Sequence, residues 1–182
     1  MTRSNWFILG MAVLAAGLGG FVEHRQRQPD ALIIGQTLPA ISLPDLEGKT
    51  HALSDYRGHR GHRVLLNFWA SWCGPCLDEM PALNRAQAKF GDSTASGPGA
   101  LVVGIAMDDP TLARAFLAAH PLNYPILLGN LNEPSTTLQL GDATTVLPYS
   151  LLVGSDGQVL ATHTGPLSKE EMAAWLNSNG KP

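Results

Sequence analysis

Two cysteines separated by two residues are the groups in this sequence best suited to chemistry. Cys73 and Cys76 are its only cysteines, so a disulfide within the chain joins near neighbours and cannot link distant segments. At this spacing the two side chains can lie roughly 5 to 6 Å apart on one face of a helical turn and bridge without moving the backbone. The pair therefore predicts a site that alternates between a dithiol and a disulfide. The alternative is two buried cysteines that only pack in the core.

The neighbouring residues predict that a strand leads into Cys73 and that a helix follows it. Val64 to Ala70 is an apolar run typical of a buried strand, and residues 75–90 carry apolar residues at helical spacing. Pro75 fits the first helical position, where its missing N–H costs nothing. Unpaired N–H groups and the helix dipole at such a start favour an anion and lower the pKa of a thiol. We therefore expect Cys73 to be the nucleophile and Cys76 to be the resolving cysteine.

Short apolar runs alternate with helical stretches along the rest of the chain. This pattern predicts the α/β class, with strands joined by crossover helices into a largely parallel sheet. Residues 40–53 contain a strand, a turn and a return, which predict an N-terminal β-hairpin. Asp109 is expected to cap a helix that turns Leu112 and Phe116 inward. The other expected elements are strands over 101–106 and 124–128, a hairpin of 149–153 with 158–162, and a last helix capped by Ser168 and Glu171.

Composition narrows the possible functions. The 182 residues, 45% of them hydrophobic, can bury one sizeable core and predict a single domain, which we expect to be monomeric. A net charge of -3 provides no excess of cations for nucleic acid. Two thiols fall short of the four ligands of a structural zinc site, and no histidine lies at a spacing that completes one. We therefore expect neither nucleic-acid binding nor a metal site.

The N-terminal part of the sequence predicts attachment to a membrane. Trp6 to Val22 contains no charged side chain, and its length of roughly 25 Å as a helix is at the short end for a bilayer. A cleaved signal peptide is the alternative, but no clear Ala-x-Ala cleavage site is present, which favours an uncleaved anchor over 1–22. Residues 23–36 are polar and predict a linker, so the domain is expected to span 37–182. Arginines on both sides of the apolar segment leave its orientation open.

The segment from Asn67 to Cys76 (NFWASWCGPC) is similar to the active-site segment of thioredoxins, and more closely to that of the TlpA/ResA-type membrane-anchored thioredoxins. The similarity extends to Leu53–Gly58, to Glu79-Met80-Pro81 and to Leu147-Pro148. It implies a thioredoxin fold, with a mixed central sheet and an added N-terminal hairpin, on the periplasmic side of the inner membrane. It also implies reduction of disulfides in exported proteins, often apocytochrome c, with a membrane dithiol as electron donor and no cofactor beyond the disulfide.

The resemblance assigns roles to four further positions. Pro148 matches the family's cis-proline, as against an ordinary trans proline that opens a strand. Leu147 would then offer its main chain to an extended substrate segment, as against simply filling the core. Because thioredoxins have a buried acid where this chain has Asn67, another base is needed for Cys76, and Glu79 matches a family glutamate; the alternative is a solvent-exposed acid. Trp72 either shields the disulfide and contacts substrate or covers the core.

The residues between the cysteines bear on the direction of electron flow. Gly74 and Pro75 form the dipeptide of thioredoxin, whose potential of about -270 mV lies near the reducing end. Reduction of substrate disulfides is therefore favoured over their oxidation, and a periplasmic disulfide oxidase is the alternative.

Two other functions can be weighed against disulfide reduction. A peroxiredoxin shares the character of residues 53–58, but its peroxidatic cysteine follows a threonine by three positions, whereas Ala70 precedes Cys73. A copper-binding module could use two thiolates as soft ligands for Cu(I). His163 is the only distant residue that could supply a third ligand to such a site.

Overall fold

A five-stranded sheet forms the centre of the computed structural model, which describes residues 33–56, 63–91 and 101–176. Its strand order is β5-β4-β3-β6-β7. The strands are β3 (Val64–Trp69), β4 (Leu101–Ala106), β5 (Ile126–Leu128), β6 (Tyr149–Val153) and β7 (Val159–Thr164). β3, β4 and β5 run parallel, whereas β6 and β7 are antiparallel to their neighbours. The α/β class is confirmed, and the sheet is mixed.

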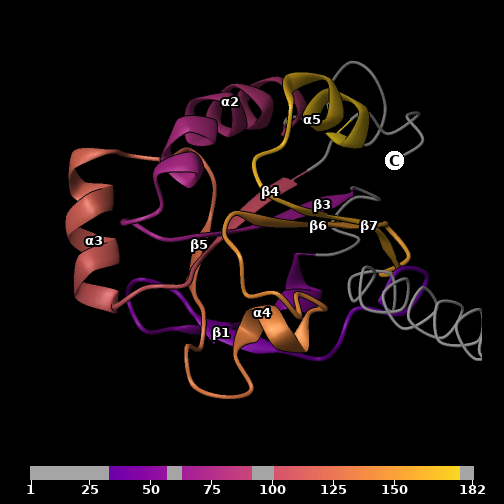
Figure 1. Cartoon of the computed structure of the whole chain (residues 1–182), viewed down its shortest axis with the longest axis horizontal. Coiled ribbons are helices and arrows are strands. Elements are labelled where there is room, and N and C mark those ends of the chain that lie inside the picture. The colour runs from indigo at the N-terminus through magenta and orange to yellow at the C-terminus, as the bar shows by residue number, and fades with distance from the viewer. Residues whose placement is uncertain (1–32, 57–62, 92–100, 177–182) are drawn as a thin grey trace, which may run out of the picture.

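Helices and a hairpin cover both faces of this sheet (Figure 1). The helices are α2 (Gly74–Phe90), α3 (Pro110–Ala119), α4 (Thr136–Gln139) and α5 (Lys169–Leu176), with a 3-10 turn at Leu53–Asp55. α2 and α5 lie side by side on one face. The opposite face carries α4 and the expected N-terminal hairpin, which consists of β1 (Ser42–Pro44) and β2 (Thr50–Ala52).

The central strand β3 is buried on both faces, which explains its unbroken apolar sequence. Successive side chains of a strand point to opposite faces. Leu65 accordingly packs with Leu83 of α2 and Trp175 of α5, whereas Phe68 lies in the core beneath the hairpin. β3 therefore ends at the site with its backbone fixed from both sides.

The folded domain begins before the expected boundary at position 37. Ile33 is buried in the core beneath the hairpin. The Gly35 amide donates to the Val159 carbonyl at 2.8 Å, and the Leu38 amide donates to the Gly157 carbonyl at 2.9 Å. Residues 33–36, which the sequence placed in the polar linker, are thus part of the domain. The anchor expected over 1–22 lies outside the described residues.

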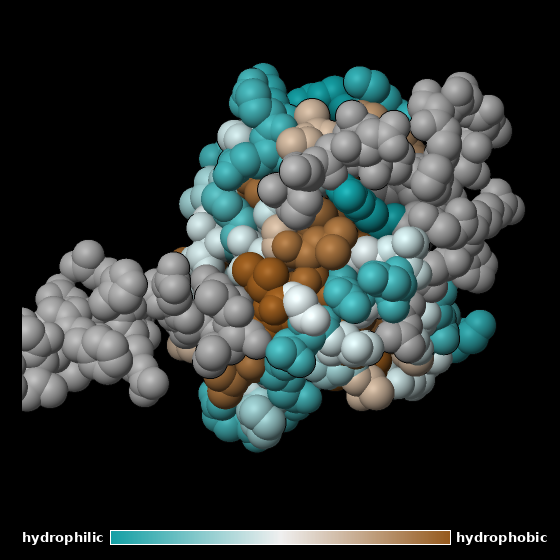
Figure 2. All heavy atoms as spheres, turned by 90° about the vertical axis from the view of Figure 1, so that its right-hand side faces the viewer, coloured by the Kyte–Doolittle hydropathy of each residue, from teal (hydrophilic) through white to brown (hydrophobic). Residues whose placement is uncertain are grey.

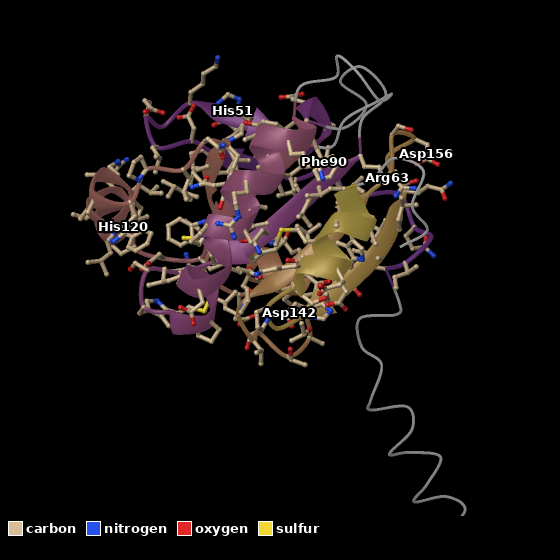
Figure 3. The ribbon with its side chains drawn as sticks, turned by 90° about the horizontal axis from the view of Figure 1, so that it is seen from above. His51, Arg63, Phe90, His120, Asp142 and Asp156 are labelled. Carbon is tan, nitrogen blue, oxygen red and sulfur yellow. A yellow bond between two sulfur atoms is a disulfide. The ribbon has the colours of Figure 1, made fainter. Side chains whose placement is uncertain are left out.

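The two ends of the sheet carry different features. β3 leads into the cysteines at its Trp69 end, while the β6–β7 turn lies at its Val64 end because Val64 pairs with Val153. Figure 3 shows Arg63, Phe90 and Asp156 on one side of the molecule, opposite His120. The end with the β6–β7 turn faces the viewer in Figure 2, where hydrophobic residues form a patch between hydrophilic ones.

Two local expectations need correction. Leu112 was expected on the inner face of its helix, but it is 54% exposed, whereas Ala113 is buried and Phe116 packs against the core. α4 and the connection around it were not predicted. Within the described residues, no helix is long and apolar enough to cross a bilayer.

Candidate active site

The two cysteines form a disulfide at the start of α2. Their Cα atoms are 5.3 Å apart. Cys73 is the N-cap residue, and its sulfur accepts a hydrogen bond from the Cys76 amide at 3.3 Å. The helix begins at Gly74, so Pro75 occupies its second position and not its first. Both cysteines are buried, Cys76 more fully, which agrees with its expected inner position.

Asp108, the second residue after β4, holds the turn that precedes Cys73. Its Oδ2 accepts from the Ser71 amide at 2.7 Å and its Oδ1 from the Asp109 amide at 2.9 Å. The Met107 amide also donates to the Trp69 carbonyl at 2.7 Å, which joins the same two segments. Asp108 is only 5% exposed. The sequence analysis missed it, although a polar residue at the carboxyl end of a strand beside the site strand was a usable signal.

Glu79, three residues after Cys76 in α2, is buried at 6% exposure and is not the solvent-exposed acid of the alternative. Its Oε1 accepts from Asn67 Nδ2 at 2.7 Å, and its Oε2 accepts from the Leu167 amide at 3.0 Å. Burial raises the pKa of the Glu79 carboxyl, and these two hydrogen bonds partly offset the effect. Asn67 of β3 also donates to Ser150 Oγ of β6 at 3.1 Å. Glu79 is thus bonded directly to Asn67 and Leu167 and, through Asn67, to β6.

The expected substrate-binding residues lie beside the cysteines. The Leu147–Pro148 peptide bond is cis, and Leu147 is half-buried against the core. Trp72 is 69% exposed and therefore does not cover the core. Between Trp72 and Leu147 lies a groove of about 220 Å³, here called the Trp72 groove. Its lining residues are Trp72, Met107, Leu131, Glu133, Ser135, Thr137, Thr145 and Leu147.

The described residues give the copper alternative little support. His163 lies in β7, with its Nδ1 3.6 Å from Glu171 Oε1. No group of three His, Cys, Asp or Glu residues that could hold a metal ion occurs in the described part of the chain. His163 thus contacts a carboxylate of α5 and is not grouped with the thiols.

A buried dithiol-disulfide pair at the start of a helix, backed by a carboxylic acid and flanked by a cis-proline, defines a thiol-disulfide oxidoreductase. The model of the AhpC/TSA family matches residues 34–162. The chain is 32% identical to the thiol-disulfide oxidoreductase ResA of Geobacillus kaustophilus over 92% of its length and 91% of that protein. It therefore belongs to the AhpC/TSA family, and within it to the ResA-type thiol-disulfide oxidoreductases.

Other relatives and solved structures agree with this assignment. The thioredoxin-like protein YneN of Bacillus subtilis is 32% identical over 79% of this chain and 78% of its own. A putative thiol:disulfide interchange protein DsbE from Chlorobium tepidum superposes with a TM-score of 0.63 at 31% identity, covering 77% of this chain and 91% of the other. A secreted thiol-disulfide isomerase from Corynebacterium glutamicum, at 24% identity, has the same fold with a TM-score of 0.63 and covers 77% and 83%. The expected thioredoxin-like fold is confirmed.

Proposed function

We propose that this oxidoreductase reduces disulfides in exported proteins and that Cys73 starts the reaction. The observation that carries the proposal is the place of Cys73 as N-cap of α2, with the Cys76 amide directed at its sulfur. An anion at this position gains from the helix dipole and from the amide donor, so the thiolate of the reduced protein is stabilised. The Cys73 thiolate attacks one substrate sulfur, the substrate disulfide breaks, and the departing sulfur takes up a proton.

Cys76 completes the reaction. Its thiol loses a proton and attacks the Cys73 sulfur of the mixed disulfide, which releases the second substrate thiol and forms the Cys73–Cys76 disulfide. The substrate gains two electrons and the protein loses two. We assign Glu79 as the proton acceptor, because burial raises the pKa of its carboxyl and makes it a better proton acceptor than an exposed carboxylate. Trp72 and the main chain of Leu147 hold the substrate segment beside the sulfurs.

A dithiol donor in the membrane restores the reduced protein, since the disulfide is the only redox group that this scheme requires. The Gly74-Pro75 pair supports reduction as the direction of the reaction. The apolar segment over 1–22 supports a single-pass anchor in the cell membrane with the catalytic domain in the periplasm. We include apocytochrome c among the substrates on the resemblance to TlpA/ResA-type proteins, and we treat the protein as a monomer.

Trapping with Cys76→Ser tests the scheme. This variant keeps the nucleophile but cannot resolve the mixed disulfide, so exported proteins should accumulate on Cys73 and be released by a reducing agent. Cys73→Ser is the matched control and should capture nothing. Reduction of insulin disulfides by the wild-type protein should accompany the trapping. Absence of both trapped protein and insulin reduction would overturn the proposal.

A further inference from the structure

The Trp72 groove is lined by the residues that precede the nucleophilic cysteine and the cis-proline. Trp72 directly precedes Cys73, and Leu147 directly precedes the cis-proline. A polypeptide whose cysteine reaches Cys73 therefore comes close to two residues of this groove. The residues next to the substrate cysteine are the ones that come within its reach.

The far wall of the groove comes from the connection between β5 and β6. Leu131 is 55% exposed there, and the exposed Glu133 follows two residues later. Hydrogen bonds within this connection fix its shape, because the Asn130 amide donates to Thr136 Oγ1 at 2.7 Å and the Thr136 amide donates to the Asn130 carbonyl at 2.9 Å. The wall is thus preorganised and presents an aliphatic side chain beside a carboxylate.

The chemistry of the lining selects the kind of occupant. Trp72, Met107, Leu131 and Leu147 supply apolar surface, and Glu133 is the one charged residue among those that line the groove. A volume of about 220 Å³ is below the roughly 300–1,000 Å³ typical of small-molecule sites. It suits one or two side chains of a peptide and not a cofactor.

We infer that the Trp72 groove selects protein substrates in which the reactive cysteine is flanked by a large apolar residue and a lysine or arginine. The apolar side chain packs between Trp72 and Leu131, and the cation pairs with Glu133. This inference rests on the proposed function and names the substrate class for the same site. It gives the β5–β6 connection the role of specificity determinant, separate from the residues that exchange electrons.

Peptide disulfides test the inference with the reduced full-length protein. Three short peptides, each dimerised through one cysteine, carry Leu and Lys, Leu and Glu, or only Gly around that cysteine. The second-order rate constant is measured for each peptide and for hydroxyethyl disulfide, which is too small to fill the groove. The Leu-Lys peptide should react roughly tenfold faster than the Gly peptide, the factor that partial burial of one apolar side chain and one exposed ion pair provide together.

Variants of the far wall separate the two contributions. Glu133→Lys should reverse the preference between the Leu-Lys and Leu-Glu peptides, and the milder Glu133→Gln should abolish it. Leu131→Ser should slow both Leu peptides by about threefold and leave the Gly peptide and hydroxyethyl disulfide unchanged.

Two matched controls lie outside the groove. Glu47→Lys makes the same charge change on the hairpin, and Leu112→Ser makes the same change at a leucine that is 54% exposed; both should leave all rates unchanged.

Equal rates for the three peptides would overturn the inference and leave the proposed function standing. The same holds if the controls alter peptide preference as strongly as the groove variants do. If reduced wild-type protein fails to react with hydroxyethyl disulfide and with every peptide, the proposed function falls as well.

Discussion

At Glu79, burial and hydrogen bonding act on one carboxyl group in opposite directions. Removal from water raises its pKa, while donors from Asn67 and Leu167 favour the ionised form. A carboxyl with a raised pKa can take a proton from Cys76 and later return it. The proposed proton transfer and the effect of this carboxyl on stability can be measured separately.

Glu79→Gln should slow resolution more than initial attack. The amide cannot accept the Cys76 proton, so release of product should slow by roughly 10²-fold or more near neutral pH and recover as pH rises. Single-turnover kinetics with a peptide disulfide would show a mixed disulfide that accumulates. The rate at which the mixed disulfide forms, which reports attack by Cys73, should stay unchanged. If Glu79→Gln resolves the mixed disulfide as fast as the wild-type protein, Glu79 is not the proton acceptor.

The same substitution should change how stability depends on pH. Because the folded pKa of Glu79 lies above its ordinary value of 4.5, the folded state binds this proton more tightly than the unfolded state does. The resulting stabilisation is present in full below the unfolded pKa and is lost as pH rises through the folded pKa. Urea titrations of the oxidised protein should show a fall in unfolding free energy over this window that is smaller in Glu79→Gln. If the unfolding free energy depends on pH equally in both proteins, the raised pKa of Glu79 is contradicted.

Asp108 should influence Cys73 through its charge as well as through its hydrogen bonds. In Asp108→Asn the turn keeps one acceptor for the Ser71 amide but loses a negative charge that is bonded two residues before Cys73. The pKa of the reduced Cys73 thiol should therefore fall, by less than about one unit, as measured by the pH dependence of its alkylation. A purely structural role predicts an unchanged or higher pKa, because a disordered turn weakens the helix start.

Asp109→Asn is the control for this change. It removes the same charge one residue further along, where the carboxylate caps α3 through the Thr111 and Leu112 amides. Asparagine caps a helix as well as aspartate does, so the fold should be kept. A shift in the Cys73 pKa as large as that of Asp108→Asn would show that the effect does not depend on the position of the Asp108 charge at the turn before Cys73.

At the scale of elements, β4 approaches its neighbours closely at Gly104. An added Cβ would lie 2.7 Å from Ile126 Cδ1 and 3.2 Å from Trp69 Nε1. Gly104→Ala should therefore destabilise the protein by about 1 kcal/mol in urea unfolding, at the lower end of the usual cost of overpacking. Ile126 Cδ1 ends a flexible side chain and can turn away, whereas the Trp69 ring is fully buried. Gly74→Ala, where nothing lies within 4 Å of the new Cβ, should cost no stability.

The elements that could be predicted are those whose signal is local. β3, α2 and the β6–β7 hairpin follow from apolar periodicity and turn residues, and both the Asp109 cap and the Ser168 capping box were recognised from residue type alone. Leu112 was misplaced because its burial depends on how α3 meets the sheet, which periodicity within ten residues does not fix. α4 has only four residues and is held by contacts across its own loop. It is therefore too short to show a helical periodicity in the sequence.

The residues of the site also divide into those with a local sequence signal and those whose position depends on the packed fold. Cys73, Cys76 and Pro148 stand in recognisable motifs, whereas the donors to Glu79 come from residues 12 and 88 positions away in sequence. Burial of Glu79 is a property of the packed domain, so the choice between a buried base and an exposed acid stayed open until the fold was known. The far wall of the Trp72 groove was missed for the same reason, whereas Asp108 had a usable signal in its position after a strand.

At the scale of the whole molecule, the proposed anchor predicts how the full chain partitions. Expressed in a bacterial host, the full-length protein should sediment with membranes and resist extraction at high pH, because a helix through the bilayer is not released by loss of charge contacts. A chain that starts at residue 30 should stay soluble and keep its disulfide chemistry. Recovery of the full chain in the soluble fraction would contradict the anchor.

The place where the N-terminal segment joins the domain bears on which way the cysteines of an anchored protein would face. Residues 35–38 are bonded to the β6–β7 turn, and that turn lies at the far end of the sheet from the cysteines. If the proposed anchor holds the protein at this end of the sheet, the cysteines lie at the end that faces away from the membrane and toward soluble substrates. The proposed membrane donor would then be reached only when the domain reorients relative to the membrane. Shortening the sequence between the proposed anchor and Ile33 should therefore slow re-reduction of the disulfide more than it slows reaction with soluble substrates.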